Sequence, residues 1–304
     1  MKKFYSLLLT MLLTVSAMAC DVCGSGPGNY YNGLLPVFHR FFIGLRYQQS
    51  HLQTHLGPDG RVTYLSSKER YSVMELWGGI SFSKRFRLMF SLPYTSIQRK
   101  TISETEKESG PGDINLVGYY QLITPKKEST FAQSLWLGAG IKLPTGRYDN
   151  NQENIGLGLQ NNFQLGSKST DFSLNLMYDI SYRNTGIDLN MAYRFNSVNK
   201  FQYKYGDRLT TNLLFYQRVA LAKNIYLTPN TGLMFESGAR DEKAKGISVW
   251  NSGGHASSFV AGMECSLGRI NIGVNFQDPF SQRIAEKRVK MENRVMAYLS
   301  YSFP

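Results

Sequence analysis

Two cysteines near the amino terminus have the most distinctive chemical spacing in this sequence. Cys20 and Cys23 stand in "CDVCGSG" with C-x-x-C spacing, which suits either a disulfide or half of a metal site. The sequence has no second C-x-x-C, which argues against a closed structural zinc site. In an oxidising compartment we expect a small disulfide loop. A soft-metal site for copper or zinc, completed by His39, is the alternative.

The other histidines offer less specific chemistry. His51 and His55 in "SHLQTHL" would share one face of a helix and form a metal pair, but no third ligand clusters with them. We therefore expect solvated loop histidines. His255 lies in "SGGHASS" near Ser257 and Ser258. A hydrolytic site at these residues is an alternative, because catalytic triads are recognised by their geometry and not by sequence order. A flexible loop rich in glycine and serine is the simpler interpretation.

Single charged residues between apolar neighbours form a third candidate set. Each occupies the polar side of an alternating segment, where a charge must meet water or an opposite charge. Such residues could select solutes by charge, or they could pair across a narrow lumen and plug it. They are Arg46, Glu75, Arg87, Lys142, Asp179, Asp188, Arg194, Arg218, Glu236 and Glu264.

The elements that must position these charges are strands. Apolar and polar residues alternate with period two, as where Ile43, Leu45 and Tyr47 alternate with Gly44 and Arg46. About twelve such segments occur, each of roughly ten residues, which is enough to cross a bilayer when tilted. They are 43–47, 74–82, 86–94, 114–122, 131–143, 172–180, 187–195, 209–218, 225–235, 257–267, 270–276 and 295–303.

The connections between these segments alternate between long and short. Long links are expected at 50–69, 99–112, 145–168, 196–205, 237–255 and 278–292, with tight turns between them. This asymmetry predicts an all-β fold: a single transmembrane antiparallel β-barrel of about 12 strands, with long external loops and short periplasmic turns. In lipid every backbone amide must be paired, so we expect the last strand to pair with the first, near residues 42–49.

Composition and the amino terminus agree with export to an outer membrane. The net charge is +12, the mean hydropathy is −0.29, and no run after the first residues approaches about 18 consecutive apolar residues. Lys2-Lys3, the apolar run 4–15 and "AMA" at 17–19 predict a signal peptide. We expect a signal peptide at 1–19, a periplasmic segment with C-x-x-C at 20–37 and a barrel at 38–304. Lipidation of Cys20 is an alternative outcome of cleavage.

Two short segments resemble motifs of a known family. "GPGDINLVGYY" (110–120) and "LGAGIKLPTGRY" (137–148) resemble the G-x-G-D and K-x-P-T-G segments of outer-membrane barrels labelled as MetA-pathway phenol-degradation or transporter proteins. "CDVCGSG" resembles a subset that opens with C-D-x-C-G-C, although Ser25 replaces its third cysteine. The resemblance implies an integral outer-membrane protein that passes solutes, and no residue here supports the phenol label. From the residues themselves, Gly110 and Gly112 allow positive φ at a junction between loop and strand, and Asp113 can cap the turn.

The expected function is an outer-membrane channel or transporter for passive passage of small solutes in a Gram-negative cell. Arg46, Arg87, Arg194 and Arg218 could form a positive ladder that favours anions. The alternative is a closed barrel with a structural, adhesive or metal-handling role through its loops and amino-terminal cysteines. A rim hydrolase using His255 is a third possibility. We expect no catalysis and no cofactor.

The expected partners follow from this location. They are outer-membrane lipid, lipopolysaccharide, the barrel insertion machinery and an unidentified small solute. The terminal strand with its aromatic Phe303 resembles the signal that this machinery reads. We expect no nucleic acid partner, because the signal sequence and the absence of a basic cluster argue against one. Basic residues in the last long link are expected to meet lipopolysaccharide. They are Arg283, Lys287, Arg288 and Lys290.

Overall fold

The computed structural model describes residues 41–125, 130–148, 163–243 and 246–303. The expected signal peptide, the segment 20–37 and the side chains of Cys20, Cys23 and His39 lie outside the described residues. The predictions made for them stay predictions. Among the described residues, no helix is long and apolar enough to cross a membrane.

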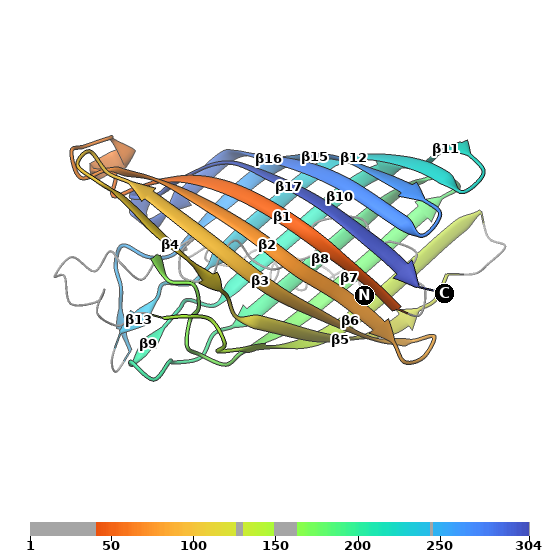
Figure 1. Cartoon of the computed structure of the whole chain (residues 1–304), viewed down its shortest axis with the longest axis horizontal. Coiled ribbons are helices and arrows are strands. Elements are labelled where there is room, and N and C mark those ends of the chain that lie inside the picture. Colours follow the sequence, from red (N-terminus) through yellow and green to blue (C-terminus); the bar gives the residue numbers. More distant parts are fainter. Residues whose placement is uncertain (1–40, 126–129, 149–162, 244–245, 304) are drawn as a thin grey trace, which may run out of the picture.

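Twelve antiparallel strands close into one barrel, as Figure 1 shows. Each strand pairs with its neighbour in the chain, and the ring closes where the last strand meets the first. The prediction of an all-β barrel of twelve strands is therefore confirmed. The strands are β1 (Phe41–Thr54), β2 (Ser67–Ser81), β3 (Phe86–Lys100), β5 (Ile114–Ile123), β6 (Phe131–Leu143), β7 (Asp171–Tyr182), β8 (Thr185–Phe195), β10 (Arg208–Gln217), β12 (Ile225–Gly238), β15 (Gly254–Leu267), β16 (Ile270–Ile284) and β17 (Lys290–Phe303).

Short elements extend this wall at its two ends. β4 (Thr105–Pro111) pairs with the outer half of β3, and β11 (Val219–Ala222) continues β10 along β12. β9 (Tyr203–Lys204), β13 (Glu242–Lys243) and β14 (Ile247–Ser248) form a separate three-stranded sheet in the long connections. Two single turns of 3-10 helix lie in other connections, η1 (Pro58–Gly60) and η4 (Ala285–Lys287).

The seam between β1 and β17 runs from Phe41 opposite Phe303 to Gln53 opposite Lys290. The phenyl rings of Phe41 and Phe303 lie 4.9 Å apart between centroids and close the seam at its inner end. At Gly44 a Cβ atom would lie 2.6 Å from the Leu299 carbonyl oxygen, so the seam requires glycine there. This confirms the expectation that the final strand pairs with the first.

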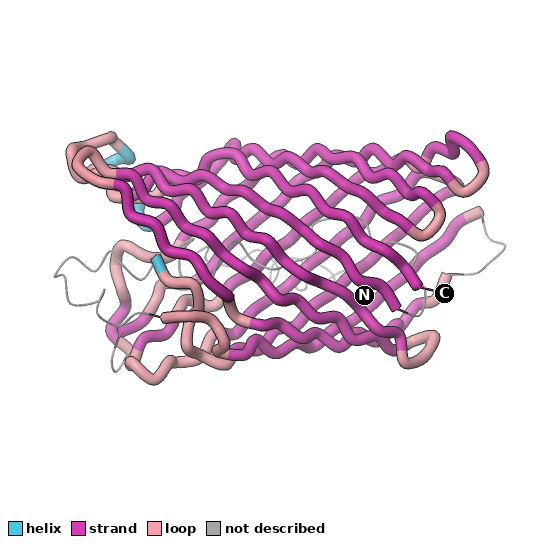
Figure 2. The backbone as a smooth tube through the Cα atoms, in the orientation of Figure 1, coloured by secondary structure: helices cyan, strands magenta, loops and turns pink. Residues whose placement is uncertain are grey.

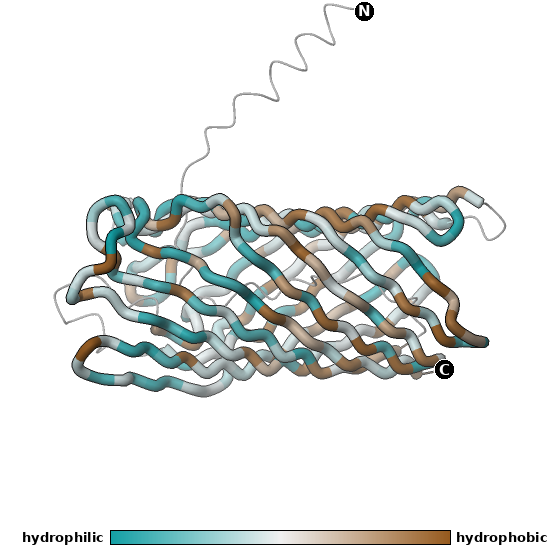
Figure 3. The backbone as a smooth tube through the Cα atoms, turned by 90° about the horizontal axis from the view of Figure 1, so that it is seen from above, coloured by the Kyte–Doolittle hydropathy of each residue, from teal (hydrophilic) through white to brown (hydrophobic). Residues whose placement is uncertain are grey.

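The two faces of each strand meet different surroundings. On β17 the side chains of Val295 and Leu299 are 46% and 50% exposed on the outside, whereas Met296 and Tyr298 are 1% and 5% exposed inside. Figure 3 shows the resulting alternation of brown and teal along the strands. A closed sheet with an apolar exterior satisfies its own backbone in hydrocarbon.

Tight turns and long connections separate to opposite ends of the barrel (Figure 2). Residues 183–184, 223–224 and 268–269 join strands at the end where β1 begins and β17 finishes. At the other end, several strands continue beyond the expected limits. The expected long link 278–292 shrinks to 285–289, and the link 50–69 to 55–66. These boundaries were wrong because alternation of hydropathy marks strands only where one face meets lipid.

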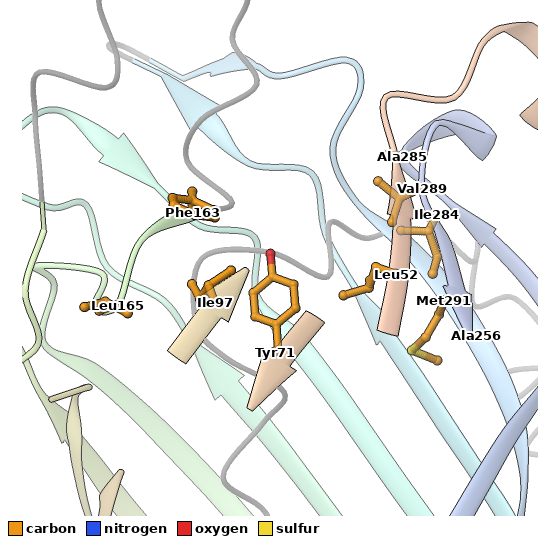
Figure 4. Close-up of a cluster of buried hydrophobic side chains, with 10 residues drawn as sticks. All are labelled: Leu52, Tyr71, Ile97, Phe163, Leu165, Ala256, Ile284, Ala285, Val289 and Met291. Carbon is orange, nitrogen blue, oxygen red and sulfur yellow. The ribbon is translucent and has the colours of Figure 1, made fainter. Parts of the chain in front are cut away.

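A hydrophobic cluster lies inside the barrel at the end with long connections. Figure 4 shows inward side chains of β1, β2 and β3 facing those near the β16–β17 link. Phe163 and Leu165, from the connection between β6 and β7, complete the cluster from the lumen side. The barrel therefore has an apolar core at its outer mouth. Its members are Leu52, Tyr71, Ile97, Phe163, Leu165, Ala256, Ile284, Ala285, Val289 and Met291.

Candidate functional site

A recess in the wall of the lumen is the main candidate for contact with solute. It contains about 550 Å³ of space free of protein atoms, including its open side. Arg46 on β1 and Arg194 on β8 supply its cationic groups, and Trp77 on β2 and Tyr119 on β5 supply its aromatic surface. Small polar and apolar groups complete the lining. They are Met89, Phe90, Ser91, Asn115, Val117, Ser173 and Asn175.

The charge of Arg46 is balanced by a partner on the next strand. Arg46 lies directly opposite Glu75, and its Nε donates to Glu75 Oε2 at 2.5 Å. Ser91 donates to the other carboxylate oxygen, and the Arg46 guanidinium lies 5.4 Å from the centre of the Trp77 ring. Both members of the pair are buried. The recess therefore presents one neutralised arginine, Arg46, beside a second arginine, Arg194.

The four arginines predicted as a ladder occupy different surroundings. Arg46 and Arg194 line the recess, whereas the Arg87 guanidinium stacks 4.4 Å from the centre of the Trp136 ring. Arg218 follows the last residue of β10 and is exposed at the end with tight turns. A continuous ladder through the lumen is thus absent from the described residues.

Predicted acidic side chains gather toward the end with tight turns. Asp179 on β7 lies directly opposite Asp188 on β8, and Tyr216 donates to Asp179 Oδ2 at 2.8 Å. Glu264 on β15 is buried and also faces the lumen. The lumen therefore changes from arginine-lined at the recess to acidic nearer the tight turns.

Several lumen charges were missed by the sequence prediction. Arg99 donates from Nε to Glu69 Oε1 at 2.8 Å, and both are buried near the outer mouth. Arg294 reaches the predicted Glu236 at 3.4 Å and Gln277 at 3.1 Å. Arg294 shares the inward side of β17 with Met296, so its parity in the last strand was an available signal.

The two motif segments meet at one junction above the recess. Lys142 Nζ lies 2.7 Å from Asp113 Oδ2 and 2.7 Å from Asp171 Oδ2, and all three side chains are buried. Asp113 also accepts hydrogen bonds from the backbone N–H of Gly146 at 2.9 Å and of Ser167 at 3.0 Å. The Lys142 junction, defined as these five residues, fixes both ends of the connection between β6 and β7.

Glycines in the motifs provide space at this junction. Gly110 and Gly112 allow positive φ, but neither glycine adopts it in the structure. A Cβ atom at Gly110 would lie 3.0 Å from Leu165 Cδ1, and one at Gly112 would lie 3.0 Å from Pro93 Cγ. The glycines therefore let the inward connection approach the wall.

The connection between β4 and β5 carries Asp113, whose pKa responds to this junction. Burial alone would raise the pKa of the Asp113 carboxyl. The Lys142 ammonium and the N–H groups of Ser167 and Gly146 outweigh burial and hold the pKa below its ordinary value. The carboxylate is therefore ionised at neutral pH and pairs with the ammonium.

Among the described residues, the histidines form neither a metal site nor a catalytic site. His51 lies within β1, not in a loop, and its Nδ1 is 3.2 Å from Asn293 Oδ1. His55 follows that strand with φ of 56°, so the two do not share a helix face. His255 forms no hydrogen bond with Ser257 or Ser258 in the part of the chain that the structure describes. The described residues contain no group of three potential metal ligands.

The sequence and the fold were compared with known proteins. Residues 46–236 match the family described as "Putative MetA-pathway of phenol degradation". The fold is similar to the COG4313 outer membrane channel from Pseudomonas putida F1, with a TM-score of 0.64 and 15% identity over 91% of this chain and 99% of that one. It is also similar to the β domain of the Bordetella autotransporter Brka, with a TM-score of 0.50 and 12% identity over 87% and 100% of the chains. No curated protein matches the chain.

Proposed function

The chain belongs to the MetA-pathway phenol-degradation family, and from this membership and the barrel geometry we propose that it is a passive outer-membrane channel for small solutes. The closed barrel, apolar outside and polar within, is an integral outer-membrane protein. The observation that carries the proposal is the recess in the lumen wall. A solute in transit would meet arginine, aromatic and amide groups there.

The charges of the lumen support selection by charge. Arg194 lies in the recess together with the Arg46–Glu75 pair, and the acidic side chains of Asp179 and Asp188 lie closer to the tight turns. The arginines would favour an anion at the recess. We therefore expect weak selectivity that depends on individual residues.

A closed resting state is supported by the outer mouth. The hydrophobic cluster and the Lys142 junction hold the described ends of the connection between β6 and β7, residues 144–148 and 163–170, against the inside of the barrel. This arrangement also favours the second candidate function, a closed barrel with a structural role. Conduction would then require the connection to move, or a narrow path beside it.

Conductance across planar bilayers tests the proposal. We expect discrete currents from protein whose folding is verified by heat-modifiable migration on gels. In Arg194→Gln the reversal potential under a salt gradient should shift toward cation preference, because one lumen cation is lost. Folded protein that carries no current, alone and after weakening of the Lys142 junction, would favour the closed structural barrel.

We propose that the barrel is not an enzyme. His255 lies on β15 opposite Ser237 and Arg283, without a hydrogen bond to the nearby serines. A nucleophile and its base need to be within hydrogen-bond reach. An esterase activity that is lost in His255→Ala, with folding unchanged, would contradict this.

A further inference from the structure

Beyond the apolar band, five exposed cations gather on the outer face of the barrel, around one carboxylate, Glu292, which accepts a hydrogen bond from Gln53 at 2.6 Å. We propose that this face binds the phosphate groups of lipid A, the membrane anchor of lipopolysaccharide. The face is defined by five exposed side chains on strands β17, β2, β3 and β4, with β1 between β17 and β2, and it is called the outer basic face below. Its members are Lys68, Arg70, Lys100, Lys107 and Lys290.

The pairing of the strands brings these cations together. Lys68 lies directly opposite Lys100, and Gln53 of β1 lies between Lys68 and Lys290 in the same row. Directly opposed residues on one face have Cβ atoms about 4.5–5.5 Å apart, and like charges in such pairs are destabilising. Isolated in water, this arrangement would cost the sheet free energy.

A second row lies closer to the membrane. His51, Arg70, Gln98 and Lys107 are successive partners across β1, β2, β3 and β4. Arg70 donates to Gln98, so its guanidinium lies flat along this row. Arginine binds phosphate in a bidentate manner, and neighbouring lysines add point charges.

The inward face of the same strands is arranged differently. Arg99 pairs with Glu69 at 2.8 Å and with Glu106 at 3.4 Å. Among the described residues, none of the five outward cations forms an ion pair. Their charges therefore remain available to an anion from outside the chain.

The height of the outer basic face matches a lipid headgroup. Met74 and Tyr94 are large exposed side chains on the same outward faces of β2 and β3. Arg70 is four residues beyond Met74, which places it roughly 9 Å higher on a strand tilted by about 45°. Acyl chains can contact Met74 and Tyr94 while the phosphates of the same molecule reach Arg70 and the lysines.

The basic residues expected earlier to meet lipopolysaccharide are mostly engaged elsewhere. Arg283 Nη2 lies 2.6 Å from Glu286, and Arg288 donates to the Leu56 carbonyl oxygen at 3.1 Å. Lys287 lies 3.9 Å from Asp59. Of the expected four, Lys290 alone belongs to the outer basic face.

Binding of purified lipids to the full chain in detergent tests this proposal. The variant K68Q/R70Q/K100Q/K107Q removes four charges from the outer basic face. Its matched control, K84Q/R85Q/K223Q/R269Q, removes four exposed charges from the end with tight turns. We expect bisphosphorylated lipid A to bind the first variant about tenfold or more weakly, since each exposed ion pair contributes up to about 1 kcal/mol. The control should bind as the unmodified chain does.

Three further probes identify what is recognised. Lipid A without phosphates should bind the unmodified chain as weakly as it binds the K68Q/R70Q/K100Q/K107Q variant. Phosphatidylglycerol and inorganic phosphate should compete poorly, because neither spans several cations and the apolar band together. Equal binding of phosphatidylglycerol would overturn the assignment to lipid A. Equal loss in the two charge variants would overturn the location.

Thermal unfolding of the unmodified chain tests the proposal even where a variant fails to fold. Lipid A should raise the thermal unfolding temperature, and added salt should reduce this shift because exposed charges are screened. The double variant K68Q/K100Q should unfold at the same or a higher temperature without lipid, since it removes an opposed pair of like charges. A lipid-induced shift that is insensitive to salt would contradict the proposal.

Discussion

At the scale of single residues, the buried pair Arg46–Glu75 controls the electrostatics of the recess. Its two side chains lie directly opposite on β1 and β2, and Ser91 completes the hydrogen bonding of the carboxylate. Such a pair is neutral as a unit, but either partner alone is a buried charge. The pair can therefore be tested by comparing single and double replacements.

Glu75→Gln should destabilise the barrel by roughly 3–5 kcal/mol, because Arg46 then keeps an uncompensated charge. The double variant R46M/E75M should lie much closer to the unmodified chain, since it removes both charges and keeps similar volume. Urea unfolding in detergent, followed by tryptophan fluorescence, measures both. Equal losses in the single and double variants would show that packing, rather than charge, dominates this position.

The sequence largely predicts which side chains of a strand face the lumen, but not which residues those side chains pair with. Period-two alternation identified Arg46, Glu75 and Arg194 as lumen residues, because lipid enforces apolar side chains on the other face. The meeting of Lys142 with Asp113 and Asp171 was not predictable, since these residues lie far apart in the sequence and no alternation relates them. Their pairing depends on how one connection folds inward.

At the scale of elements, the Lys142 junction holds the two described ends of the connection between β6 and β7 against the barrel wall. Lys142→Met should release this connection, because two buried carboxylates lose their cation at a cost of roughly 3–5 kcal/mol. We expect faster hydrogen exchange at the amides of Gly146 and Ser167, together with larger conductance. Lys84→Met, at an exposed turn of the opposite end, is the control and should change neither.

The response of this junction to pH follows from the lowered pKa of Asp113. A carboxyl with a lower pKa in the folded than in the unfolded state stabilises the fold above its unfolded pKa. That contribution disappears as the pH falls through the folded pKa. Protection of the Gly146 and Ser167 amides should therefore persist from neutral into mildly acidic solution and be lost only in strong acid. Loss of protection near neutrality would contradict this assignment.

The outer ends of the strands could not be predicted from the sequence. Inside the bilayer one face meets lipid and the other meets the lumen, so hydropathy alternates and the strands were found. Beyond it, Lys68 and Arg70 face water while Glu69 and Tyr71 pack inward, so β2 continues through residues that had been assigned to a loop. The outer basic face could not be recognised without the register of these extensions.

At the scale of the whole molecule, closure of the ring depends on the contact between β1 and β17. Gly44→Val should prevent this contact, because a Cβ atom would meet the Leu299 carbonyl oxygen at 2.6 Å and Trp77 Nε1 at 2.9 Å. We expect loss of heat-modifiable gel migration and accumulation of unfolded protein. Ala297→Val on the lipid side of β17 adds two carbon atoms outside the barrel, against three for Gly44→Val, and should assemble normally. Normal assembly of Gly44→Val would show that the seam tolerates a wider spacing.

The seam also orders events during biogenesis. β1 has two hydrogen-bonding neighbours, and one of them, β17, lies at the other end of the described chain. Until β17 pairs with it, β1 has an edge of unpaired backbone groups, and such an edge can pair with strands of other chains and cause aggregation. Long-range pairing of this type is slow as well. This edge of β1 is therefore a site at which the folding chain can aggregate until β17 pairs with it.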